Sequence, residues 1–169
     1  NYGQKSFKKE LESTKTSSKI LEVPLEILDV TGLGIISSGL TTDSIPASEN
    51  PLFPGRNMIL LSIAAAYAFT KFIDIVAIAV LSDSNFPDQT KEFIKSAEST
   101  ISIALGHQIK IWSPFIELNK LEVVRIAKKY NFPLNFTYSC YDGGEKPCGK
   151  CLSCKDRRSV LELEHINDL

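Results

Sequence analysis

The clearest chemistry in this sequence belongs to four cysteines near its end: Cys140, Cys148, Cys151 and Cys154. The last three form two overlapping C-x-x-C steps, and each step can turn so that both sulfurs face one point. Glycines and a proline between them allow the backbone to wrap an ion. The pattern predicts one zinc ion held by four thiolates, with no open coordination position and therefore a structural role.

Free thiols, an iron–sulfur cluster and two disulfides are the alternatives for these cysteines. A chain of 169 residues can bury a sufficient core without disulfides. A metal site in a reducing cytoplasm fits better. We expect backbone amides around Gly149 and Lys150 to donate hydrogen bonds to the sulfurs.

The composition is that of an ordinary globular protein, with 43% apolar and 23% charged residues. The net charge of −1 supplies no global positive field, which argues against a nonspecific nucleic-acid binder and an anionic membrane partner. The most apolar stretch, Met58 to Phe69, is shorter than the roughly 20 residues of a membrane helix. No secretory leader is recognisable, so we expect a cytoplasmic protein.

Hydrophobic periodicity then indicates the elements that must position this site. Predicted helices cover Gln4–Leu21, Asn57–Lys71, Asp88–Leu105, Asn119–Tyr130 and Ser153–Ile166. Predicted strands cover Val23–Val30, Asp74–Leu81 and Ile109–Trp112, with a long irregular stretch over residues 31–54.

Two local patterns sharpen this assignment. The unbroken apolar run 74–81 is typical of a central parallel strand covered on both faces. Asn119 and Glu122 resemble a capping box. Strands alternating with helices predict a parallel sheet, whose ligands lie beyond the carboxyl ends of the strands. The loops after Val30, Leu81 and Trp112 are therefore the places to look for chemistry.

Six strings in a fixed order carry a family resemblance over essentially the whole chain. They are YGQ at 2–4, LTTDSIP at 40–46, FPGRN at 53–57, FPDQTKEF at 86–93, LNK at 118–120 and TYSCYDGGEKPCGKCLSC at 137–154. Together they resemble the 7-cyano-7-deazaguanine synthase family of queuosine biosynthesis, within the PP-loop ATP pyrophosphatase superfamily.

The resemblance implies an α/β fold with a HUP-like, adenine nucleotide alpha hydrolase-like parallel sheet in three α/β/α layers. A C-terminal zinc-binding segment with four cysteine ligands completes it. Residues 1–135 would form the nucleotide- and substrate-binding domain. Residues 136–169 would add the zinc segment and the last helix of the same domain.

The resemblance also implies a ligase. ATP activates 7-carboxy-7-deazaguanine, ammonia gives the amide, and a second activation yields 7-cyano-7-deazaguanine for queuosine or archaeosine. ATP with magnesium is then a substrate, and one structural zinc ion is the resident metal. The expected partners are these small molecules, with no direct nucleic acid, no membrane and a homodimer as an open option.

The cationic site residues implied by the family are Arg56 and Lys120, both in expected catalytic roles. Arg56 follows a Pro-Gly turn at a helix mouth, where its guanidinium could grip a phosphate or the substrate carboxylate. Lys120 resembles the superfamily lysine that contacts ATP phosphates. The alternatives are a structural arginine bound to a loop carbonyl and a solvated lysine.

Arg56, Asn57, Asp83, Phe86 and Asp88 are the expected substrate contacts. Phe86 can stack on the flat heterocycle, and a carboxylate can accept hydrogen bonds from its guanidine-like edge. Asp88 could equally be a helix N-terminal acid. The family commonly has Tyr-Pro-Asp-Cys where this chain has Phe-Pro-Asp-Gln, so any role of a cysteine there is lost.

The chain begins just before YGQ, whereas the family has an upstream SGGxDS-type PP-loop. We expect these residues alone to lack productive ATP binding and activity. A sequence that begins partway through its protein is favoured over a truncated gene product. Two other functions stay open: another PP-loop ATPase, such as one that thiolates transfer RNA, and a non-catalytic zinc-ribbon interaction module.

Overall fold

The computed structural model describes residues 1–48, 50–84 and 86–166. The chain folds as two compact units. Unit 1 comprises Asn1–Pro54 and Val124–Leu169, and unit 2 comprises Gly55–Val123.

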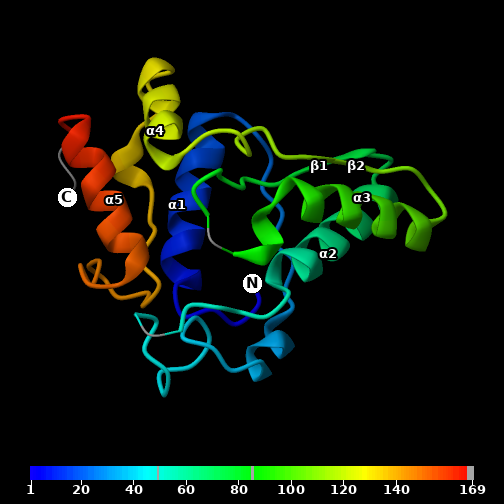
Figure 1. The fold of residues 1–169 in the computed structure, drawn as a ribbon, viewed down its shortest axis with the longest axis horizontal. Coiled ribbons are helices and arrows are strands. Elements are labelled where there is room, and N and C mark those ends of the chain that lie inside the picture. The colour runs from blue at the N-terminus through cyan, green and yellow to red at the C-terminus, as the bar shows by residue number, and fades with distance from the viewer. Residues whose placement is uncertain (49, 85, 167–169) are drawn as a thin grey trace. The chain divides into compact units, whose positions relative to one another are not determined.

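Unit 2 has a parallel sheet of two strands, β1 (Ile75–Ala77) and β2 (Lys110–Trp112), with Val76 opposite Ile111. Two helices, α2 (Arg56–Thr70) and α3 (Lys91–Leu105), pack against these strands on one side (Figure 1). The α/β class with a parallel sheet is thus confirmed.

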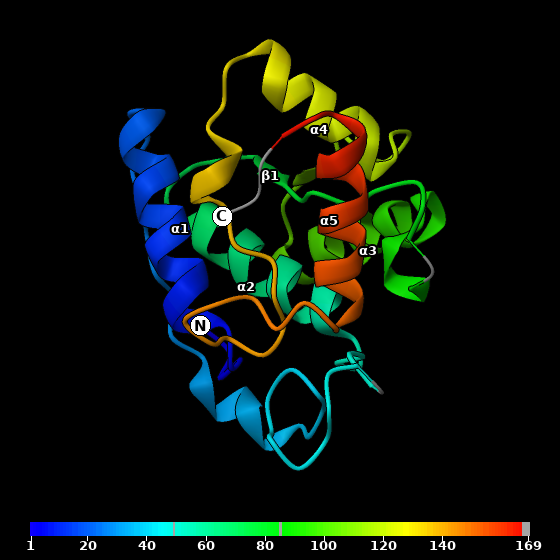
Figure 2. The ribbon, with the colours of Figure 1, turned by 90° about the vertical axis from the view of Figure 1, so that its left-hand side faces the viewer.

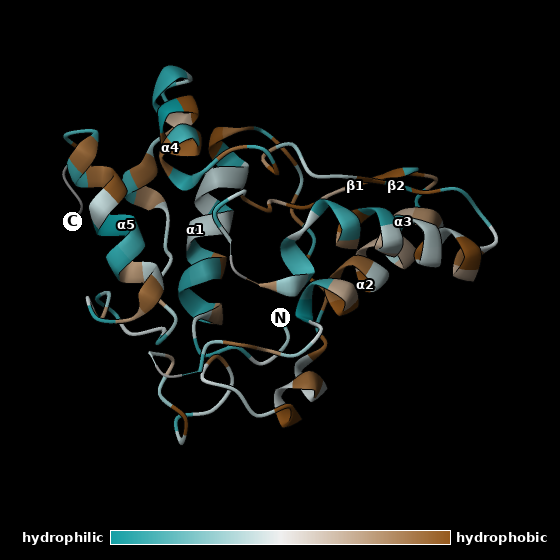
Figure 3. Ribbon diagram, in the orientation of Figure 1, coloured by the Kyte–Doolittle hydropathy of each residue, from teal (hydrophilic) through white to brown (hydrophobic). Residues whose placement is uncertain are grey.

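The core of unit 2 is formed by small and branched apolar side chains from all four elements. Its buried members are Leu61, Ala65, Ala68, Val76, Val80, Ile94, Ala97, Ile101, Ile109 and Ile111. In Figure 3, α2 is mostly hydrophobic in colour, as its Ala- and Leu-rich sequence predicts. This cluster is a conventional hydrophobic core.

The predicted strand 74–81 is shorter in the structure, and its predicted burial on both faces is wrong. Val76 is buried, but its neighbour Ile75 is 58% exposed, and Trp112 of β2 is 56% exposed. Side chains alternate along a strand, so the face that carries Ile75 is the one away from the α2–α3 core. Among the described residues of unit 2, helices form one covering layer.

Local capping explains where the helices of unit 2 begin and end. The Thr90 hydroxyl accepts a hydrogen bond from the Phe93 amide at 3.1 Å and starts α3. Gly106, in the left-handed conformation with φ of 61°, ends it. A short 3₁₀ turn, η2 (Pro87–Gln89), precedes α3.

The helix α4 (Lys120–Lys129) begins at the predicted capping box, which is confirmed in both directions. The Glu122 amide donates to Asn119 Oδ1 at 3.0 Å, and the Asn119 amide donates to Glu122 Oε2 at 2.8 Å. Each side chain therefore satisfies a backbone donor that the helix leaves open.

Unit 1 contains α1 (Phe7–Ile20), α5 (Leu152–Leu163) and two 3₁₀ turns, η1 (Thr31–Ile35) and η3 (Leu134–Phe136). In Figure 2 the cysteine-rich loop, drawn in orange, runs from beside the N-terminal end of α1 to the N-terminal end of α5. No residue of α1 is buried, which agrees with the predicted surface helix.

The predicted strand Val23–Val30 is not formed. Val23 and Ile27 are each about half exposed, and the segment joins no sheet in the described part of the chain. It is tied down by Asn1 instead: the Val30 amide donates to Asn1 O, and the Asn1 amino group donates to Leu28 O. A strand needs a neighbour for its ladder, which sequence propensity does not supply.

No helix of the described chain is both long enough and apolar enough to cross a membrane.

Candidate metal centre and active-site residues

The four cysteines converge on one point in unit 1. Their sulfur atoms all lie within 4.8 Å of one another, and the Cys148 and Cys154 sulfurs are 4.0 Å apart. Three of the residues, Cys140, Cys151 and Cys154, are buried, and all four are free thiols. The predicted convergence of the four cysteine sulfurs is confirmed.

The donor set fits a tetrahedral metal ion. Four sulfurs placed about 2.3 Å from one zinc ion would lie roughly 3.8 Å from each other. The observed sulfur spacing is close to that value and far above the length of a disulfide. The geometry therefore disfavours the disulfide alternative and provides four soft ligands for one ion.

Backbone amides point at the sulfurs, as the sequence predicts. The Cys148 amide donates to Cys140 Sγ at 3.3 Å, and the Cys151 amide donates to Cys148 Sγ at 3.4 Å. Burial raises the pKa of Cys154 and of Cys148, and the amides of Gly149 and Lys150, respectively, oppose that rise. These donors favour the thiolate, which is the form that binds a metal.

Burial and these amides act in opposite directions on the thiols. Burial opposes ionisation of Cys140, but hydrogen bonds from the Cys148 and Asp142 amides outweigh it and lower its pKa to about 7. Burial raises the pKa of Cys148 and of Cys154 above that of an ordinary thiol. A cation among the sulfurs would supply the charge that keeps all four ionised.

Two tyrosines, Tyr138 and Tyr141, pack against the cysteines and were not anticipated as part of the site. The Tyr138 hydroxyl donates to Gly144 O at 2.9 Å, and burial raises the pKa of its phenol. The string TYSCY is the sequence signal for this packing, because it places a tyrosine on each side of Cys140.

The cysteine loop is fastened to the start of α1 by close backbone contact. Gly143 has φ of 70°, and a Cβ there would collide with Lys5 O and lie 2.9 Å from Ser6 Cα. Lys5 Nζ lies 3.6 Å from both Asp43 and Asp142. Only glycine fits this approach, because it combines positive φ with the absence of a side chain.

In unit 2, Asn57 and Asp88 are brought together. The Asn57 amide donates to Asp88 Oδ2 at 3.1 Å, and Asn57 Nδ2 donates to Asp88 O at 3.0 Å. Asp88 thus satisfies a first-turn amide of α2, not of its own helix. Asn57 is buried, whereas Phe86 is half-buried.

The other two predicted residues of this edge, Asp83 and Lys120, also meet. The Lys120 amide donates to Asp83 Oδ2 at 3.2 Å, and Ser82 N donates to Leu118 O at 2.9 Å. The loop after β1 therefore lies beside the start of α4, as expected for the carboxyl edge of a parallel sheet.

Arg56 opens α2 directly after Gly55, which has φ of 66°. Its side chain is half-buried and has no hydrogen-bond or ion-pair partner among the residues that the structure describes. A helix N-terminus and a guanidinium together make a positive local field.

The residues of the YGQ string and His107, a histidine of unit 2, have structural contacts. Gln4 accepts a hydrogen bond from the Tyr2 amide and donates to Glu10, while the Tyr2 ring meets Phe53 edge-on at 5.3 Å. His107 is exposed and lies 2.8 Å from Asp74.

Comparison with known proteins places this geometry in a family. The family described as Queuosine biosynthesis protein QueC matches residues 1–164. A 7-cyano-7-deazaguanine synthase of Methanobrevibacter smithii is 34% identical and aligns with 99% of this chain and 82% of that protein. The enzyme of the same name from Prochlorococcus marinus MIT 9312 is 35% identical and aligns with 96% of this chain and 80% of that protein. The one from Allorhizobium ampelinum is 36% identical and aligns with 99% of this chain and 77% of that protein. The chain therefore belongs to the QueC family of queuosine biosynthesis proteins.

Proposed function

We propose that this protein is an ATP-dependent ligase that converts 7-carboxy-7-deazaguanine and ammonia to 7-cyano-7-deazaguanine. The observation that carries the proposal is the family match over residues 1–164, with relatives named 7-cyano-7-deazaguanine synthase that align with at least 96% of the chain. The four converging cysteines support it, because the string that contains them was part of the resemblance.

The reaction needs activation because a carboxylate is a poor electrophile. Transfer of the adenylyl group of ATP to the carboxylate oxygen releases pyrophosphate and gives an acyl-adenylate. Ammonia then attacks the acyl carbon, and loss of AMP and a proton leaves the amide. A second ATP transfers its adenylyl group to the amide oxygen with release of pyrophosphate. The amide nitrogen then loses its two protons, and AMP departs with the oxygen to leave the nitrile. Magnesium would neutralise the charge on the ATP phosphates.

Arg56 and Lys120 are the proposed catalytic cations. Arg56 is supported by its place at the first residue of α2, where the helix end adds positive field, and by a guanidinium without a described partner. Lys120 is supported by its place at the first residue of α4, beside the loop after β1. Both would stabilise negative charge on the transferred phosphoryl group.

The proposed substrate contacts are Arg56, Asn57, Asp83, Phe86 and Asp88. The contacts of Asn57 with Asp88, and of Lys120 with Asp83, fix the carboxylates in defined orientations. In each aspartate one carboxylate oxygen accepts a hydrogen bond from a backbone amide. The other oxygen is therefore the candidate acceptor for the N–H groups of the heterocycle.

Zinc is the metal we propose for the cysteine centre, in a structural role. Four thiolates would occupy all four coordination positions of a tetrahedral ion and leave none for substrate. The chemistry would then be carried by unit 2 residues and the phosphates, while the metal fixes the loop between Tyr138 and α5.

The test is product formation by the complete gene product supplied with ATP, magnesium, ammonium and 7-carboxy-7-deazaguanine. Mass spectrometry should detect 7-cyano-7-deazaguanine. Arg56→Ala should lower kcat/KM by about 100-fold or more without unfolding the protein, because a charge-stabilising group is lost. Arg125→Ala removes an exposed arginine that pairs with Glu164 and should leave turnover unchanged. Wild-type turnover by Arg56→Ala would remove that residue from the mechanism, and absence of the nitrile from the wild type would refute the activity.

A further inference from the structure

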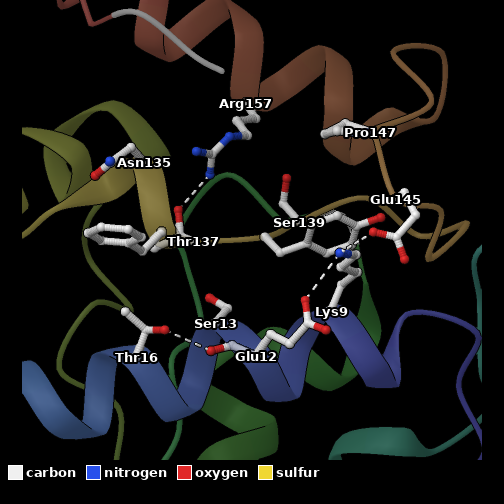
Figure 4. A pocket seen from close by; sticks show the side chains of 12 residues that line it. Lys9, Glu12, Ser13, Thr16, Asn135, Thr137, Ser139, Glu145, Pro147 and Arg157 are labelled. Carbon is white, nitrogen blue, oxygen red and sulfur yellow. Dashed lines mark hydrogen bonds and ion pairs between the residues drawn. The ribbon is translucent and has the colours of Figure 1, made fainter.

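A polar cavity of about 310 Å³ lies within unit 1, between α1 and the segment that leads into the cysteine loop. Figure 4 shows side chains from α1, from this segment and from α5 pointing into it. Tyr138 lines the cavity and also packs against the cysteines, so the cavity and the metal centre share a wall. The volume suits one small ligand.

Two polar faces meet across the cavity. From α1 come Lys9, Glu12, Ser13 and Thr16, and from the facing segment come Asn135, Thr137 and Ser139. The first set follows the spacing of one helix face, and the second set alternates along the chain. Two packed elements normally present apolar faces to each other. Because both faces here are polar, the space between them indicates a site for water or a polar ligand.

The Ser139 hydroxyl adds an independent observation. Its Oγ is buried and has no hydrogen-bond partner within residues 1–48, 50–84 and 86–166. A buried hydroxyl without a partner is costly, and in native structures it usually meets a ligand or an ordered water. Ser139 stands on the cavity wall, and Figure 4 shows its hydroxyl within the space between α1 and α5.

The charges in the cavity balance and are held in place. Lys9 Nζ lies 2.6 Å from Glu145 and 3.1 Å from Glu12. Arg157 donates to Thr137 Oγ1 at 2.7 Å and to Leu134 O at 3.0 Å. Two cations and two carboxylates leave no net charge to attract an ion, so an uncharged ligand with donors and acceptors is favoured.

The shape of the ligand is indicated by Phe136, which lines the cavity and is 50% exposed. An exposed aromatic face accepts a flat ring system. Glu12 uses Oε2 for Lys9, and a carboxylate can also accept the paired N–H donors of a guanine-like edge. The Ser139 hydroxyl can donate to a ring carbonyl.

We infer that this cavity binds an uncharged, flat heterocycle of the guanine type, and that the nitrile product of the proposed reaction is such a ligand. Naming the product rests on the proposed function. The acid precursor carries a carboxylate that the balanced cavity does not compensate. The cavity is therefore a product-holding site beside the metal centre, and it uses none of the unit 2 residues proposed for catalysis.

Calorimetric titration of the complete protein without ATP tests this inference. The probes are 7-cyano-7-deazaguanine and 7-carboxy-7-deazaguanine, and the nitrile should bind more tightly. Glu12→Gln should weaken nitrile binding by about tenfold and Ser139→Ala by about fivefold, as expected for one charged and one neutral hydrogen bond. The matched controls Glu162→Gln and Ser159→Ala lie on α5 outside the cavity and should leave the affinity for the nitrile unchanged.

Metal content and thermal unfolding of each variant establish that it is folded. Nitrile binding that is unaffected by both cavity variants would overturn the inference and leave the proposed function intact. Preferential binding of the acid would overturn it as well. If the wild type makes no nitrile while the variants weaken heterocycle binding as stated, the proposed function fails and the site stands.

Discussion

The two units differ in the interactions that stabilise each of them internally. Unit 2 has a continuous apolar core in which Ala65 and Ile109 are fully buried. Unit 1 buries scattered apolar side chains such as Phe53 and Leu161, but its cluster of buried residues consists of three cysteines lined by tyrosines, and α1 has no buried residue. From this difference we propose that unit 2 draws its stability from hydrophobic burial, whereas unit 1 depends on a metal ion bound by its four cysteines.

The largest effect is expected from Cys151→Ser, because Cys151 is 1% exposed and its sulfur belongs to the four-cysteine cluster. Loss of one thiolate should release the metal, measured as zinc per chain, and unfold the cysteine loop with α5. The control is Leu152→Ala, since its side chain is 48% exposed. Unchanged zinc content in Cys151→Ser would remove this residue from the ligand set.

In unit 2 the corresponding disruption is Ile109→Ala, which empties a position that is 0% exposed. It should lower the free energy of unfolding of unit 2 by about 3 kcal/mol through lost burial and a cavity. Zinc content should stay at the wild-type value. Ile103→Ala, at a residue 79% exposed, should change stability little. Zinc loss in Ile109→Ala would contradict the separate origins of stability.

Gly143→Ala tests the contact between the cysteine loop and the start of α1. The methyl group would collide with Lys5 O at a position with φ of 70°. The change should destabilise unit 1 by about 2 kcal/mol and weaken zinc retention against a chelator. Gly32→Ala is the matched control, because a Cβ there meets nothing within 4 Å. Equal zinc retention by the two variants would show that the contact is dispensable.

The smallest effect is a pH dependence in unit 2 that arises from Glu98. Burial opposes its ionisation, but the Ile111 amide, 2.8 Å from Oε2, and Lys110 outweigh it and lower its pKa. A lowered folded-state pKa means that the stabilisation is present above the unfolded-state pKa, near 4.5, and is lost as the pH falls through the folded value. Glu98→Gln should remove about 1 kcal/mol of stability at pH 7 and little at pH 3. Equal losses at the two pH values, measured by urea unfolding, would contradict this.

Local sequence signals predicted much of the fold. Helix composition located α2, capping signals located α4, and the C-x-x-C spacing located the four cysteines whose sulfurs converge. Each of these is determined by residues close together in the chain. The parallel pairing of β1 with β2 followed from the alternation of strands and helices.

The failures of sequence reasoning concern partners that are distant in sequence. Val23–Val30 has strand propensity, but it bonds to Asn1 instead of a sheet. The approach of Gly143 to Lys5 joins residues far apart in the chain, and no local pattern announces it. The Asp88–Asn57 hydrogen bond likewise crosses from one helix start to another. Such contacts follow from tertiary packing, which overrides local propensity.

Hydrogen exchange of the complete protein, measured by mass spectrometry before and after removal of zinc by a chelator, tests the central claim most directly. We expect amides of the cysteine loop, α5 and the start of α1 to lose protection, while amides of α2, α3, β1 and β2 keep theirs. Equal loss of protection in both units, or no change in either, would contradict the dependence of unit 1 on its metal.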